Sequence, residues 1–177
     1  AAIGDTFSKG GNVIIPSFAL ERTQEILYFL REGLAAGQLP ANMQVFLDSP
    51  MAISATEIFR RHPECYDDDS ARLFAGGDDP FGFPGLHFTS TTDQSMALNI
   101  FHSGAVIIAG SGMCTGGRVR HHLKHNLWRE HCSVVFVGFA ARGTLARKIV
   151  DGAESVNIYG EEIAVRARIY TIGGFSA

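Results

Sequence analysis

The segment GSGMCTGGRVRHHLKHNL, residues 110–127, gathers residue types that bind anions and metal ions. Its first half holds four glycines, two hydroxyl residues and a cysteine, and its second half is rich in arginine and histidine. Glycines let backbone N–H groups approach a phosphate closely, while hydroxyls and a bidentate guanidinium add donors. The segment therefore predicts a phosphate-binding turn formed by Ser111, Gly112, Thr115 and Arg118. Because it matches neither the Walker pattern nor GxGxxG, a plain glycine-rich connection remains the alternative.

The histidines of this segment suggest a second interpretation, a zinc site. His121 and His125 are four residues apart on one helical face, and His131 and Cys132 follow nearby. The same helix has an apolar stripe that is expected to face the core, formed by Val119, Leu123, Leu127 and Trp128. This stripe turns His121 and His125 toward solvent, and no glutamate occupies the position of an HExxH base. We therefore expect a solvated helix face here.

Asp48 ends an apolar run in LDSPMA, where it could act as an acid, a metal ligand or a ligand-orienting group. A helix cap is the preferred interpretation, because Pro50 opens the next helix and either Ser49 or Asp48 itself could accept its first N–H groups.

Two further groups have both a chemical and a structural interpretation. Cys114 sits near a helix start, where a thiol pKa can fall, but no histidine partner is set by any recognisable spacing. Arg22 and Glu25 are one helical turn apart, which predicts a surface ion pair.

Five strand-to-helix units in series must position these residues. They are GNVIIPSF with LERTQEILYFLREGLAAG, MQVFLDSP with MAISATEIFRRH, LHFTS with TTDQSMALNIFHSG, AVIIAGSG with RVRHHLKHNLWRE, and SVVFVGFA with GTLARKIVDG. Such a series predicts an α/β domain, a mostly parallel sheet with helices on both faces. The tail predicts a C-terminal β-hairpin, with residues 156–159 turning at Gly160 into the alternating IAVRARIYTI.

In an open parallel sheet, ligands gather where strands end and helices begin. The turns PSFALERTQE, LDSPMA and GFAARGT should therefore lie beside the glycine-rich turn.

Composition limits the function classes. The net charge of −3 argues against a uniformly basic protein, yet residues 117–148 hold seven Arg or Lys against one acid, a local face suited to a polyanion. Residues 64–85 are acidic and rich in glycine and proline, which predicts a surface excursion. No apolar run reaches the roughly 18 residues of a membrane span, and three widely spaced cysteines favour a cytoplasmic location without a membrane partner.

Five blocks, in this order and spacing, resemble the β-CASP domain of the metallo-β-lactamase-fold RNases. They are GGNVIIPSFALERTQEILYFL, FLDSPMA, GSGMCTGGRVRHHL, GFAARGTLARKI and GGFSA. The group includes the cleavage and polyadenylation endonuclease, RNase J and bacterial RNA-processing exonucleases, and the resemblance runs from about residue 10 to residue 177.

The resemblance implies that the catalytic residues lie outside this chain. In the family, the β-CASP domain is inserted into a metallo-β-lactamase domain and closes over two zinc ions. The HxHxDH ligands and the motif A acid would precede Ala1, and the motif B histidine would follow Ala177. We therefore expect residues 1–177 to be a single β-CASP domain excised from a larger protein, with residues 156–177 returning toward the missing half and no catalytic residue or metal ligand of its own.

The implied function is an RNA-binding lid of a zinc-dependent ribonuclease, inactive as this fragment. On this resemblance the glycine-rich turn would hold the RNA backbone through Ser111, Gly112, Thr115 and Arg118. The second-rank candidates lie in the other strand-end turns and are Ser17, Arg22, Ser49, Arg142 and Thr144. The expected partners are single-stranded RNA, bound without sequence preference, the metallo-β-lactamase domain in cis and, as an option, a second copy of the parent. Two alternatives remain open: a stand-alone RNA- or nucleotide-binding module, and a small α/β enzyme using Cys114 or the pair His121 and His125.

Overall fold

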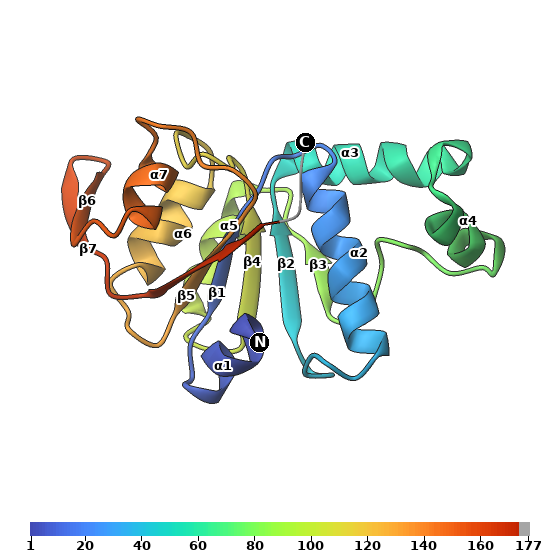
Figure 1. The fold of residues 1–177 in the computed structure, drawn as a ribbon, viewed down its shortest axis with the longest axis horizontal. Coiled ribbons are helices and arrows are strands. Elements are labelled where there is room, and N and C mark those ends of the chain that lie inside the picture. Colours follow the sequence, from blue (N-terminus) through green and yellow to red (C-terminus); the bar gives the residue numbers. More distant parts are fainter. Residues whose placement is uncertain (174–177) are drawn as a thin grey trace.

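The computed structural model describes residues 1–173, and a six-stranded parallel sheet forms their centre (Figure 1). The strands are β1 (Val13–Pro16), β2 (Gln44–Asp48), β3 (Leu86–Phe88), β4 (Ala105–Ala109), β5 (Ser133–Val137) and β8 (Arg168–Ile172). Their order is β3-β2-β4-β1-β5-β8, and each neighbouring pair is parallel. The central strands are buried throughout, which is why they read as unbroken apolar runs.

Helices cover both faces of the sheet, as the sequence predicts. Helices α1 (Ala2–Ser8), α2 (Arg22–Ala35) and α3 (Pro50–Arg61) pack on one face, and α5 (Thr92–Ala97), the 3-10 turn η2 (Leu98–Ile100), α6 (Val119–Asn126) and α7 (Leu145–Val150) on the other. The two cores divide along each strand by alternation, so that Val13 and Ile15 belong to one and Ile14 to the other. No helix within the described part of the chain is long and apolar enough to cross a membrane.

The predicted C-terminal hairpin is present but shorter than its alternating pattern suggests. Strands β6 (Ser155–Ile158) and β7 (Glu161–Ala164) pair antiparallel, and the chain then leaves the hairpin. The backbone N–H groups of Arg166 and Ala167 both donate to Leu127 O, and β8 continues as the edge strand beside β5. The final block GGFSA falls mainly on residues 174–177, which lie outside the described residues.

The acidic excursion contains regular structure that the sequence does not predict. A 3-10 turn η1 (Pro63–Cys65) and helix α4 (Asp68–Ala75) project beyond α3 (Figure 1). The Asp67 side chain caps α4 by accepting from Ser70 N at 2.8 Å. Arg60 pairs with Asp79 at 2.6 Å, and Arg31 pairs with Asp78 at 3.0 Å, so the excursion is tied to α3 and α2.

Candidate nucleic-acid interface

The carboxyl ends of the parallel strands bring four of the predicted turns to one edge of the sheet. Backbone bonds join segments at this edge: Ser17 N donates to Ala109 O at the end of β4, and Ala146 N, which follows the turn after β5, donates to Met113 O in the glycine-rich turn. The turns that follow β1, β2, β4 and β5 are therefore neighbours, as expected for an open parallel sheet.

The glycine-rich turn, residues 110–118, is folded back on itself by its own backbone. Val119 N donates to Gly110 O at 3.0 Å, and Ser111 N donates to Gly116 O at 3.3 Å. Gly117 has φ 72°, and a Cβ placed there would lie 2.3 Å from Gly110 O. Only glycine fits this position without displacing the turn.

Asp48 is fully buried and is the centre of a polar network beneath this turn. Its Oδ1 accepts from Arg118 Nη1 at 2.8 Å and Thr89 Oγ1 at 2.7 Å. Its Oδ2 accepts from Ser95 Oγ at 2.5 Å and contacts His122 Nε2 at 2.6 Å. Burial alone would raise the pKa of Asp48, but the hydrogen bonds from His122, Ser95 and Thr89 outweigh it and lower the pKa to about 2.

This lowered pKa predicts an acid-sensitive contribution to stability. The folded-state pKa of about 2 lies below the reference value of 3.8, so the contribution is complete above pH 3.8 and is lost as pH falls toward 2. Its size is about 2 kcal/mol by proton linkage. Urea unfolding of the wild type and Asp48→Asn, measured between about pH 2.5 and about pH 5.5, should show a difference in the free energy of unfolding that becomes smaller as the pH falls. A difference that does not change with pH would contradict a lowered pKa for Asp48.

Arg118 joins the glycine-rich turn to the end of β3. Besides Asp48, it donates to Thr89 O and Ser90 O, both at 2.9 Å. The guanidinium that is predicted to bind phosphate therefore already donates to three acceptors within the protein. Its binding to a phosphate stays a prediction.

The open question of which residue caps α3 has a clear answer. Ser49 is the cap, because its Oγ accepts from Ala52 N at 3.3 Å. Asp48 instead points into the protein and serves the buried network.

The hydroxyl and glycine candidates fall into two groups. Ser111 Oγ and Thr115 Oγ1 lie 3.5 Å apart at the surface of the turn. Gly112 supports the ring of Phe18, which a Cβ would meet at 2.9 Å. Three other candidates have internal roles: Ser17 is buried against Thr23, Thr144 caps α7, and Ser49 caps α3.

The profile of the Beta-Casp domain family matches residues 23–149. This chain belongs to the Beta-Casp domain family. Ribonuclease TTHA0252 of Thermus thermophilus is 41% identical over 171 residues, covering 97% of this chain and 39% of that protein. Two archaeal proteins named transcription termination factor FttA are also similar. That of Methanocaldococcus jannaschii is 34% identical over 180 residues, covering 98% of this chain and 28% of that protein. That of Thermococcus kodakarensis is 34% identical over 182 residues, covering 98% of this chain and 27% of that protein.

These comparisons confirm the resemblance that the five sequence blocks indicate. The chain spans at most 39% of the length of these three relatives.

The exposed cations of this β-CASP domain differ in how far other groups already engage them. Arg22 pairs with Glu25 at 2.6 Å, the predicted surface pair. Lys124 pairs with Glu161, and Arg147 with Asp151, both at 2.6 Å. Arg142 is exposed and makes no hydrogen bond or ion pair with the described residues, which leaves its guanidinium available at the strand-end edge.

The enzyme alternatives receive little support from the β-CASP domain itself. Cys114 is completely buried, and burial raises the pKa of its thiol to about 12, far from a reactive thiolate. His121 and His125 are exposed, as expected, and His121 Nε2 lies 3.1 Å from Tyr159 Oη. The apolar stripe predicts a buried Trp128, and this is wrong: Trp128 is 52% exposed, because α6 ends at Asn126 with Leu127 as its cap and the helical spacing does not extend to residue 128.

Sequence reasoning missed His122, the partner of Asp48. His122 lies in the buried stripe of α6, three residues after Val119 and one before Leu123. The spacing places His122 on the core face of the helix, and a histidine there needs a buried polar partner. The sequence therefore contained a signal that His122 pairs with a buried polar group.

Proposed function

We propose that this β-CASP domain is the RNA-binding part of a ribonuclease whose remaining half lies outside the chain. The observation that carries the proposal is the strand-end edge, where the glycine-rich turn contacts the turn that carries Arg142, an arginine with no side-chain partner among residues 1–173. Membership of the Beta-Casp family and the name of the Thermus relative, a ribonuclease, support it.

The surface groups at this edge suit a nucleic-acid backbone. Ser111 and Thr115 offer exposed hydroxyls on the turn, and Arg142 offers a guanidinium that can grip a phosphate with two N–H groups. Such contacts hold RNA without reading its sequence, and they weaken with salt. Arg118 would act mainly by holding the turn in shape, because Asp48, Thr89 and Ser90 already accept from three of its five N–H groups.

The zinc ions implied by the family do not fit the residues of this chain. Within residues 1–173, no group of three or more histidine, cysteine or acidic side chains is arranged to hold a metal ion. The buried pair of Asp48 and His122 is closed by Ser95, Thr89 and Arg118. We propose that the zinc ligands belong to a metallo-β-lactamase domain in cis, and that this chain binds RNA without cleaving it.

RNA binding should depend on salt and on Arg142. We expect a fluorescein-labelled single-stranded 12-mer to bind at about 50 mM salt and to weaken strongly at about 200 mM, measured by fluorescence anisotropy. Arg142→Ala should weaken binding about three- to tenfold for every sequence and lower the salt slope by about one.

Arg166→Ala is the matched control for this measurement. Arg166 is also exposed and forms no side-chain hydrogen bond or ion pair within residues 1–173. It precedes β8, however, and so lies at the amino-terminal ends of the strands, opposite the candidate interface. Absence of binding at low salt would refute the proposed function. Equal losses from Arg142→Ala and Arg166→Ala would refute the assignment to this edge.

A further inference from the structure

Met113, in the middle of the glycine-rich turn, is bonded to the segment after β5 at two points. Its Sδ accepts from Ala141 N at 3.2 Å, and its backbone oxygen accepts from Ala146 N at 3.2 Å. We call residues 141–146 the arginine loop, because they include Arg142. One methionine therefore holds the arginine loop at both of its ends.

The position of Arg142 depends on how the preceding residue, Ala141, is held. Ala141 O accepts from Thr144 N at 3.3 Å and from Thr144 Oγ1 at 2.6 Å, so its carbonyl is fixed within the arginine loop. Its N–H is fixed from outside the loop, by the Met113 sulfur. The Arg142 side chain forms no hydrogen bond or ion pair within residues 1–173. The backbone at Ala141 therefore directs the guanidinium toward the strand-end edge.

The contact between Met113 and Ala141 is open to chemical change at the sulfur. A thioether is a weak acceptor, and oxidation converts it to a polar sulfoxide. With 3.2 Å between Sδ and Ala141 N, an added oxygen has no room between the two atoms. An oxygen on the other side of the sulfur withdraws electron density from it and adds a polar group to a wall shared with Phe18 and Phe139. Either product weakens the bond that holds Ala141.

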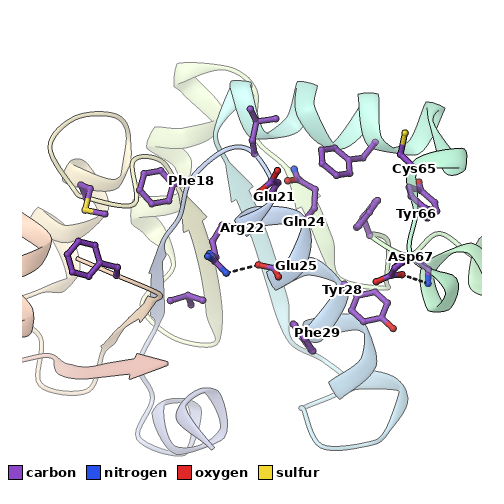
Figure 2. A pocket seen from close by; sticks show the side chains of 17 residues that line it. Phe18, Glu21, Arg22, Gln24, Glu25, Tyr28, Phe29, Cys65, Tyr66 and Asp67 are labelled. Atoms are coloured by element: carbon purple, nitrogen blue, oxygen red, sulfur yellow. Dashed lines mark hydrogen bonds and ion pairs between the residues drawn. The ribbon is translucent and has the colours of Figure 1, made fainter. Parts of the chain in front are cut away.

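A small oxidant can reach Met113 from solvent. The residue is half-buried and lines a cavity with a volume of about 920 Å³, and Figure 2 shows Phe18 on the wall of this cavity. Of the other three methionines, Met43 is only 1% exposed. Met51 and Met96 are 70% and 63% exposed, but they belong to α3 and α5 and not to the glycine-rich turn. Met113 thus combines access for an oxidant with a bond to the arginine loop.

We propose that Met113 is an oxidation site whose conversion to the sulfoxide releases the arginine loop and weakens RNA binding. The oxidant is a peroxide, such as hydrogen peroxide. A lone pair of the sulfur bonds to one peroxide oxygen, the O–O bond breaks, and the other oxygen leaves as hydroxide and takes the proton of the first, which gives sulfoxide and water. Methionine sulfoxide reductases reverse the change. The inference rests on the proposed function, since the released loop carries Arg142.

The test uses a background chain that lacks the other accessible sulfur atoms, with Met51→Leu, Met96→Leu and Cys65→Ser. Cys65 is the exposed one of the three cysteines. Hydrogen peroxide should add one oxygen atom to Met113, located by peptide mass spectrometry. Binding of the labelled 12-mer RNA at about 50 mM salt should weaken about three- to fivefold, within the loss expected for Arg142→Ala, because no other phosphate contact is removed. Treatment with the reductases should restore it.

Met113→Leu in the same background is the matched control, because leucine keeps the apolar bulk but neither accepts a hydrogen bond nor is oxidised. This variant should bind RNA about two- to threefold more weakly than the background chain, since Ala141 N loses its acceptor. Peroxide should not change its binding further. Hydrogen–deuterium exchange supplies a measurement without RNA: the amide of Ala141 should exchange faster in the oxidised chain and in Met113→Leu.

The outcomes separate this inference from the proposed function. An oxidised Met113 with unchanged exchange at Ala141, or with unchanged RNA binding, would overturn the inference and leave the function standing. So would an equal effect of peroxide on the Met113→Leu chain, which would assign the loss to another group. A Met113 that stays reduced while Met51 and Met96 of the wild type are oxidised would also overturn it. No RNA binding by the untreated wild type at low salt would overturn both.

Discussion

Replacing Asp48 with alanine is expected to lower the free energy of unfolding by about 3–5 kcal/mol. The substitution removes a fully buried acceptor that serves Arg118, His122, Ser95 and Thr89. Buried donors left without an acceptor lose their hydration and gain nothing in return. Urea unfolding at pH 7, followed by circular dichroism, measures the change directly.

Asp69→Ala is the control for this measurement. Asp69 pairs with Arg72 at 3.3 Å on the surface of α4, and both side chains are largely exposed, so its loss should change stability by no more than about 0.5 kcal/mol. Asp48→Asn keeps the size of the side chain and removes the charge, and it should fall between the two. A loss below about 1 kcal/mol for Asp48→Ala would contradict the view that the network is the hub of this edge.

The same network marks where sequence reasoning about the site succeeds and where it stops. The turns are foreseeable, because a strand that ends in LDSPMA or AVIIAGSG must deliver its polar residues to the carboxyl edge of a parallel sheet. The pairing of Asp48 with His122 cannot be predicted in this way, because the two residues are 74 positions apart in the sequence. Only the strand order β3-β2-β4-β1 brings α6 over β2.

The fold shows a similar limit at its C-terminal end. A period of two identifies a strand but not its partner. The alternating residues 163–172 therefore fit one arm of a hairpin as well as they fit two separate strands. The break comes from a tertiary contact, the donation of Arg166 and Ala167 to Leu127 O, which sends β8 to β5. The helix-covered parallel sheet was predictable because each of its units repeats a local signal.

Gly117→Ala is expected to damage both the stability and the RNA affinity of this domain. Alanine at φ 72° is strained, and its Cβ would lie 2.3 Å from the backbone oxygen of Gly110. Since that oxygen accepts from Val119 N, relief of the clash must open the turn at its base. We expect a loss of about 2–4 kcal/mol in the free energy of unfolding, measured by urea titration, and weaker binding of the 12-mer RNA.

Gly116→Ala provides the matched control one residue earlier. A Cβ at Gly116 meets no atom within 4 Å, and its φ is not positive, so alanine should change stability by no more than about 0.5 kcal/mol. If the two variants lost equal stability, the close approach of Gly117 to Gly110 would not hold the turn. If Gly117→Ala lost stability but bound RNA as before, the turn would be a structural connection, and the phosphates would have to follow Arg142 and its neighbours. Only a joint loss confined to Gly117→Ala links the shape of the turn to RNA binding.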